Sequence, residues 1–146
     1  MKKLVFGSVL ALGAMVSAIA ADVAVSAVHD YQSKNEGVRL ETTVPFGLTA
    51  SVTHIRDTAN RVAIGKDFAL TNVGPVALGA SVAGVYQNTD GKAGGVNGYG
   101  MTVGAKASYQ FNKAVSAVVG VERFIGQDRV DQFNGNLVTA GLNVKF

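Results

Sequence analysis

The chain has 146 residues, with 13 Lys and Arg against 10 Asp and Glu, and it contains no Cys and no Trp. The absence of Cys excludes disulfide bonds, thiolate catalysis and thiolate metal sites. Lys2 and Lys3 supply most of the net charge of +3, and the 11 basic residues that remain are balanced by 10 acidic ones, which argues against a basic surface for nucleic acid.

The N-terminal segment has the three parts of a secretory signal peptide. A basic start, Met1-Lys2-Lys3, precedes an apolar run over 4–16 and a small-x-small sequence, Ala18-Ile19-Ala20. A single membrane anchor is the alternative, but glycines and serines interrupt the run, which is shorter than the ~20 residues of a spanning helix. We therefore predict that residues 1–20 are removed and that residues 21–146 form one domain.

The mature chain is predicted to consist of β-strands, because its apolar residues recur with a period of two, as in Val76-x-Leu78-x-Ala80-x-Val82. The strand lengths suit tilted crossings of a hydrocarbon layer, which need roughly 9–11 residues each. The eight expected strands cover 23–31, 36–44, 47–56, 61–69, 76–86, 99–111, 114–125 and 136–146.

The connections between these strands alternate in character. Those at 45–46, 70–75 and 112–113 are short, whereas those at 32–35, 57–60, 87–98 and 126–135 include two long segments rich in Gly, Asn and Asp. Both long segments fall on the same side, as in membrane barrels with short periplasmic turns and longer surface loops. This pattern predicts that both chain ends lie on the periplasmic side.

Aromatic residues of the mature chain all occur near predicted strand ends. Membrane barrels carry aromatic girdles at both interfaces, whereas a soluble barrel would place such residues near the middle of its core. The expected inner girdle is Phe46, Phe68, Tyr109, Phe111 and Phe146, and the expected outer girdle is Tyr31, Tyr86, Tyr99, Phe124 and Phe133.

The last strand, 136–146, alternates strictly enough to have one apolar face, from Val138 to Phe146. Its order Thr139-x-Gly141-x-x-Val144-x-Phe146 resembles the C-terminal signal of bacterial outer-membrane β-barrels. The resemblance implies that Thr139, Gly141, Val144 and Phe146 are recognised by the barrel assembly machinery.

The inward-facing positions of the predicted strands carry balanced charge. An eight-stranded barrel is only wide enough to be filled by side chains, so these groups are expected to pair and to plug the lumen. The predicted lumen charge network is Asp30, Arg39, Glu41, Arg61, Asp67, Lys106, Glu122 and Lys145.

Three further basic residues, His54, Arg56 and Arg123, fall on the outward face near the outer rim. Charges cost less at the interface than at the midplane, and long side chains can extend toward water. Placement at the rim is the simpler interpretation, and the sharper one is contact with lipopolysaccharide phosphates.

Catalysis is not expected. His29 is followed by Asp30, but neighbouring residues of a strand point to opposite faces and make a poor base and orienting pair. Neither His29 nor His54 resembles the His-x-Ser-Asn stretch of lipid A deacylase barrels. No motif predicts a cofactor or a metal site.

The mature chain as a whole resembles the OmpX/Ail family and the transmembrane domain of OmpA in signal peptide, strand number, girdles and terminal motif. This resemblance implies an all-β, antiparallel up-and-down barrel in the bacterial outer membrane, surrounded by lipid and lipopolysaccharide and acting as a monomer. We predict a structural or surface-interaction role. A narrow channel and a soluble periplasmic barrel for a small apolar ligand are the alternatives.

Overall fold

The computed structural model describes residues 22–91, 94–127, 130 and 133–145. The predicted signal peptide, 1–20, and the terminal Phe146 lie outside the described residues. None of the helical turns in the described ranges is long and apolar enough to cross a membrane.

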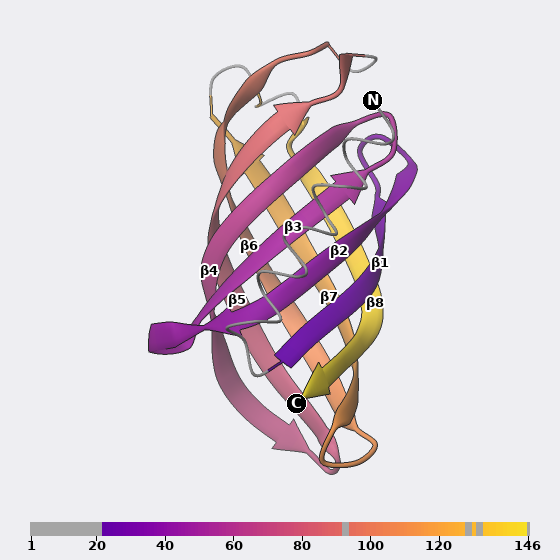
Figure 1. The fold of residues 1–146 in the computed structure, drawn as a ribbon, viewed down its shortest axis with the longest axis vertical. Helices are drawn as coiled ribbons and strands as arrows, with labels where there is room; N and C mark the ends of the chain where they lie inside the picture. Colours follow the sequence, from indigo (N-terminus) through magenta and orange to yellow (C-terminus); the bar gives the residue numbers. More distant parts are fainter. Residues whose placement is uncertain (1–21, 92–93, 128–129, 131–132, 146) are drawn as a thin grey trace.

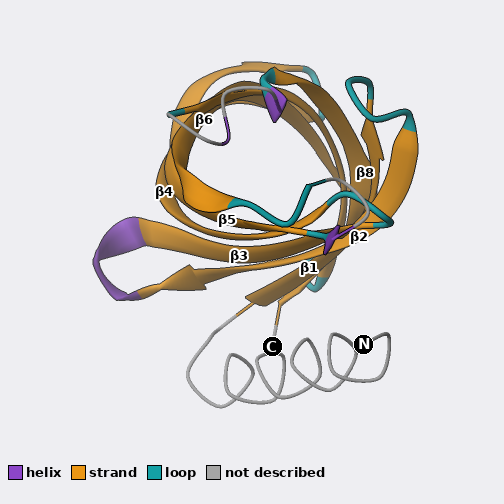
Figure 2. Ribbon diagram, turned by 90° about the horizontal axis from the view of Figure 1, so that it is seen from above, coloured by secondary structure: helices purple, strands orange, loops and turns teal. Residues whose placement is uncertain are grey.

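Eight strands form a closed antiparallel barrel in which each strand pairs with its neighbours in the sequence and β8 returns to β1 (Figure 1). The predicted eight-stranded barrel is therefore confirmed, and seen from one end the strands make a ring (Figure 2). The strands are β1 (Asp22–Asp30), β2 (Asn35–Val44), β3 (Leu48–Ile55), β4 (Ala59–Val73), β5 (Val76–Thr89), β6 (Asn97–Gln110), β7 (Val115–Gly126) and β8 (Gly135–Lys145).

The two ends of the barrel differ. We call the end with the β1–β2, β3–β4, β5–β6 and β7–β8 connections the long-loop end. The opposite end carries Asp22, Lys145 and the remaining connections, and we call it the terminal end. There β2 and β3 are joined by a 3-10 turn, η1 (Pro45–Gly47), in which Phe46 has a φ of 72°.

The alternation of β8 sets its two faces. Leu137 and Thr139 are 1% and 8% exposed, whereas Leu142 and Val144 are 50% and 39% exposed. The β1–β8 ladder runs without a break from Asp22 opposite Lys145 to Asp30 opposite Leu137. The apolar face that the sequence predicts is therefore the outer surface of the barrel.

The β4–β5 hairpin is longer than its sequence suggested. The segment 70–75 was expected to be a connection, but β4 continues to Val73 and only Gly74 and Pro75 form the turn. A register shift between Ala69 and Thr71 lets the last residues of β4 pair with the start of β5. At the other end β5 runs to Thr89, which shortens the predicted 87–98 loop.

Apolar side chains are packed inside the barrel at the long-loop end. One cluster consists of Val85, Phe124, Val130 and Phe133, and a second consists of Val28, Ile55 and Leu137. The expectation that Phe124 and Phe133 belong to an outer girdle is wrong, because they are 1% and 6% exposed. Both face inward and fill the space that the loops enclose.

Candidate functional site

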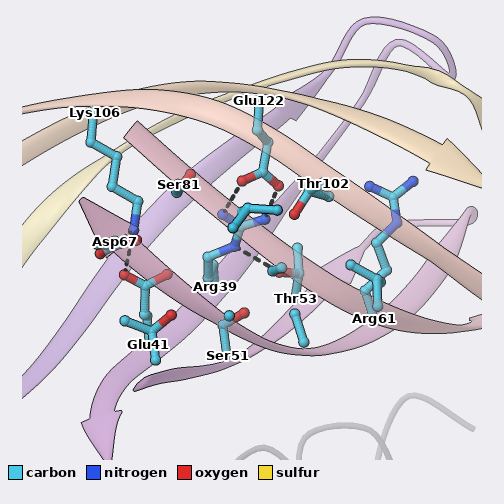
Figure 3. A pocket seen from close by; sticks show the side chains of 16 residues that line it. Arg39, Glu41, Ser51, Thr53, Arg61, Asp67, Ser81, Thr102, Lys106 and Glu122 are labelled. Carbon is cyan, nitrogen blue, oxygen red and sulfur yellow. Dashed lines mark hydrogen bonds and ion pairs between the residues drawn. The ribbon is translucent and has the colours of Figure 1, made fainter. Parts of the chain in front are cut away.

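The centre of the lumen is occupied by an ion pair between Arg39 on β2 and Glu122 on β7 (Figure 3). Arg39 Nη1 donates to Glu122 Oε2 at 2.9 Å, and Nη2 donates to Oε1. The third guanidinium donor, Nε, bonds Thr53 Oγ1 at 2.8 Å. The two charged side chains are only 10% and 11% exposed. Such a two-pronged geometry fixes both side chains as well as neutralising them.

A second cluster lies beside this pair, on the side of the terminal end. Lys106 Nζ donates to Glu41 Oε1 at 2.7 Å and to Asp67 Oδ2 at 3.0 Å. The Asp67 side chain is 41% exposed, about twice as much as the other two. Figure 3 shows Lys106 reaching toward both carboxylates from the opposite wall. Lys106 thus links β6 to β2 and β4 across the lumen.

Arg61 is buried in a different way. Its Nε donates to Gln87 Oε1 at 2.8 Å, and its guanidinium carbon lies 4.1 Å from the centre of the Phe124 ring. Its Nη2 is buried and has no hydrogen-bond partner among the described residues. Sequence reasoning missed the contacts with Gln87 and Phe124. Gln87 lies two residues after Val85 on β5, and Phe124 lies two residues after Glu122 on β7. The period of two therefore places both side chains on the inward face, which is the sequence signal that could have found them.

The remaining two members of the predicted network lie at opposite ends of the barrel. Asp30 is 2% exposed, and its carboxylate accepts bonds from Gln32 N at 3.2 Å and Ser33 Oγ at 2.8 Å. It therefore stabilises the first turn at the long-loop end. Lys145 stands opposite Asp22 at the terminal end. The structure brings five of the eight residues into two adjacent clusters, namely Arg39, Glu41, Asp67, Lys106 and Glu122.

The packing divides the lumen into layers. Apolar side chains pack at the long-loop end, and the ion pairs cross the middle, where a cavity of about 20 Å³ remains. A cavity of that size can hold a single water molecule. Below the ion pairs a cavity of about 400 Å³ extends toward the terminal end, lined by residues that include Asp22, Ser26, Thr139 and Lys145.

The three rim residues do not form one cluster. His54 Nδ1 is 2.6 Å from Asn60 Oδ1, and Arg123 Nη1 donates to Asn136 Oδ1 at 3.4 Å. His54 is on β3 and Arg123 on β7, which are four strands apart in a ring of eight. Arg56 is exposed in the turn after β3. A phosphate group can therefore meet Arg123 or the pair on the β3 side, but not all three residues together.

The described part of the terminal motif has one constrained position. Gly141 faces the lumen, and a β-carbon at this position would lie 2.5 Å from Ser26 Cα on β1. Thr139 faces the lumen beside it, whereas Val144 faces outward. Phe146 lies outside the described residues.

No group of three or more His, Asp or Glu side chains within the described ranges is arranged to hold a metal ion. His29 makes an edge contact with Tyr31, with ring centres 4.8 Å apart. Comparisons with protein-family models, with curated proteins and with solved structures give no match. The fold and its interior define a closed eight-stranded barrel whose lumen is crossed by ion pairs, and its function must be inferred from that arrangement.

Proposed function

We propose that this chain is an outer-membrane β-barrel with a structural or surface-interaction role and a lumen closed by paired charges. One observation carries the proposal: the barrel buries charged side chains in the middle of its lumen and exposes apolar side chains on its outer surface. Val25, Ile64, Val119 and Leu142, on four different strands, are each at least half exposed, whereas Arg39 and Arg61 are buried in the lumen. Contact between this apolar surface and water would have a high free-energy cost, and a lipid bilayer removes that cost.

The predicted location is further supported by exposed aromatic residues beyond this apolar surface. Tyr86 and Tyr99 contact each other near the long-loop end, with ring centres 5.1 Å apart, and Tyr109 contacts Phe111 near the terminal end at 5.2 Å. Aromatic residues at two levels are typical of membrane barrels. The predicted signal peptide would direct the chain to the periplasm, and the terminal motif would direct it to the assembly machinery.

A surface-interaction role is favoured over transport because apolar clusters occupy the lumen at the long-loop end and ion pairs cross its middle. The narrow channel is the second candidate, favoured by the 400 Å³ cavity at the terminal end. The soluble barrel for an apolar ligand is disfavoured because the larger cavity is lined by many charged and hydroxyl groups. We further propose that the barrel acts as a monomer without a cofactor.

The proposal is tested by expression of the full chain in a Gram-negative host, followed by fractionation and gel electrophoresis in detergent with and without boiling. An outer-membrane location, an N-terminus at residue 21 and faster migration of the unboiled protein are expected. Planar-bilayer recordings then distinguish the closed barrel from the channel. A protein that remains in the periplasmic fraction without detergent would refute the membrane proposal.

A further inference from the structure

The barrel wall is incomplete between β3 and β4 at the terminal end. The β3–β4 ladder ends at the pair Thr49 and Gly65, but β4 continues to Val73 and is paired there with β5 alone. The chain before Thr49 turns away through η1, which stands clear of the ring of strands (Figures 1 and 2). We call the opening between Leu48 and the Lys66–Val73 edge the seam.

The 400 Å³ cavity reaches the seam. Thr43 and Thr49 line it from the hairpin of β2 and β3, and Asp67 and Ala69 line it from the free part of β4. These residues lie on the two sides of the seam. The cavity is therefore accessible through the side of the barrel as well as through its terminal end.

The chemistry of the seam changes from apolar to charged along this path. Phe46 and Leu70, outside the cavity, are 95% and 66% exposed, and Phe68, which also lines the cavity, is 46% exposed. Inside it, Asp22 and Lys145 stand directly opposite each other on β1 and β8, and no ion pair between described residues joins them. The Asp22 carboxylate accepts neutral hydrogen bonds from Thr43 N at 3.0 Å, Thr43 Oγ1 at 3.3 Å and Asn143 Nδ2 at 3.4 Å, which hold it in place without neutralising its charge. One acidic and one basic group at the end of an apolar approach match an amphiphile whose polar part carries both charges.

The free edge of β4 adds a second requirement. Every other residue of an edge strand directs its N–H and C=O groups away from the sheet, and open edges exposed to lipid hydrocarbon are not tolerated. Phosphate and ester oxygens of a lipid can accept hydrogen bonds from such N–H groups. An amphiphile in the seam would thus satisfy the free N–H groups of the edge and supply a counter-charge to Asp22 and to Lys145.

We propose that the cavity binds the head group of a zwitterionic phospholipid that enters sideways through the seam. The phosphate lies near Lys145, the ammonium group near Asp22, and the acyl chains against Phe68 and Leu70. This inference rests on the proposed membrane location. The two can nevertheless fail separately, because different positions of a fluorescent probe report them.

The chain has no Trp, so a single introduced Trp gives an unambiguous signal. Val118 lines the cavity, and its neighbour Val119 is 53% exposed on the outer surface. Val118→Trp and Val119→Trp are placed in phosphatidylcholine vesicles with a nitroxide either on the head group or at mid-chain. We expect the head-group label to quench Val118→Trp at least twofold more than Val119→Trp, and the mid-chain label to give the reverse order. Ser108→Trp, also on the cavity wall, replaces Val118→Trp if the latter does not fold.

Entry of the lipid through the seam is tested by closing the seam with a disulfide bond. Continuing the β3–β4 register places Leu48 opposite Lys66, and the chain has no native Cys, so Leu48→Cys/Lys66→Cys can form a disulfide across the inner end of the opening, next to the cavity-lining residues Thr49 and Asp67. Oxidation should reduce quenching of the cavity Trp by the head-group label at least twofold, and reduction should restore it. Val52→Cys/Val62→Cys, on an existing rung of the same ladder, is the matched control and should change nothing.

The outcomes separate the two proposals. Equal quenching of the cavity and surface Trp by the head-group label, or quenching that persists after the seam disulfide has formed, would overturn the lipid site. If that disulfide does not form, Lys145→Gln decides, because loss of the phosphate partner should halve the quenching and an unchanged value would reject the site. Absence of mid-chain quenching at Val119→Trp would refute the membrane location itself.

Discussion

Arg39 and Glu122 are 83 residues apart in the sequence and are joined by two hydrogen bonds in the centre of the lumen. Both groups are largely removed from water, so their mutual attraction offsets a desolvation cost of several kcal/mol for each charge. The pair links β2 to β7 through the interior, independently of the backbone ladders. Its partner Thr53 extends the link to β3.

Removal of one member of this pair should be strongly destabilising. Glu122→Ala leaves the Arg39 guanidinium buried and unpaired, at a cost of ~3–5 kcal/mol. The double variant Arg39→Met/Glu122→Ala should cost less than the sum of the two single changes, because no unpaired charge remains. Reversible urea titrations in lipid vesicles measure both values, with Glu36→Ala on the exposed rim as the control. Strict additivity would show that the pair is not coupled.

Charge on the outer surface should be tolerated according to depth. Val119→Arg or Val103→Arg should cost about 2–4 kcal/mol if these positions face the middle of a bilayer. Gly91→Arg in the β5–β6 loop should cost almost nothing, because its β-carbon would meet open space. The same titrations compare the variants. Equal free energies of unfolding would argue against a lipid-facing surface.

Phe124 should be important for both stability and closure. Phe124→Ala removes the centre of an apolar cluster and the ring beside Arg61, at an expected cost of ~3–5 kcal/mol. Because the long-loop end would be less completely filled, steady small-ion conductance should rise in planar-bilayer recordings. Phe111→Ala, at a 60% exposed position, should leave conductance unchanged. If Phe124→Ala shows no increase in conductance, the ion pairs alone are sufficient to close the lumen.

Gly141 should not accept a side chain. The β-carbon of Gly141→Ala would approach Ser26 Cα to 2.5 Å, so β1 and β8 would have to separate or shift. Overpacking of this kind typically costs ~1–3 kcal/mol. Gly84→Ala, whose nearest neighbour would be 3.9 Å away, is the matched control. Equal urea midpoints for the two variants would contradict the predicted crowding.

Phe146 should be required for insertion and not for export. Deletion of Phe146 removes the terminal aromatic residue of the proposed assembly signal while leaving the signal peptide intact. We expect the chain to reach the periplasm and to be depleted from the outer membrane in fractionation. The control is Phe46→Ala, which removes another exposed aromatic side chain but keeps the length of the η1 turn. This variant should insert normally. Normal outer-membrane levels without Phe146 would reject the signal.

The number of strands, their order and the inward or outward direction of most side chains were predictable from the sequence. These features depend on the period of two, which is still recognisable when a strand boundary is misplaced by a few residues. The pairing of Lys106 with Glu41 and Asp67 follows from the same parity, since all three had to face a narrow lumen. The continuation of β4 over Leu70 to Val73 was not predictable. Gly74 and Pro75 indicate a turn, but only the register shift after Ala69 allows the preceding residues to remain paired.

The interior of the long-loop end was also missed. Phe124 lies next to a predicted strand end, and a residue at that position can belong either to an interfacial girdle or to the lumen. Its parity with Glu122 favours the lumen, whereas its position near a strand end is typical of a girdle. Phe133 had no such indicator, because the direction of a loop side chain depends on how the loop folds over the barrel.

The β1–β8 ladder has a kinetic consequence. Every other ladder joins strands that are consecutive in the chain, so those hairpins can form from local contacts, but β1 and β8 meet only after the whole intervening chain has been ordered. Closing so long a loop costs entropy before the ladder compensates for it. We therefore expect barrel closure to be the last and slowest step of folding, and changes confined to that ladder to slow folding less than they accelerate unfolding.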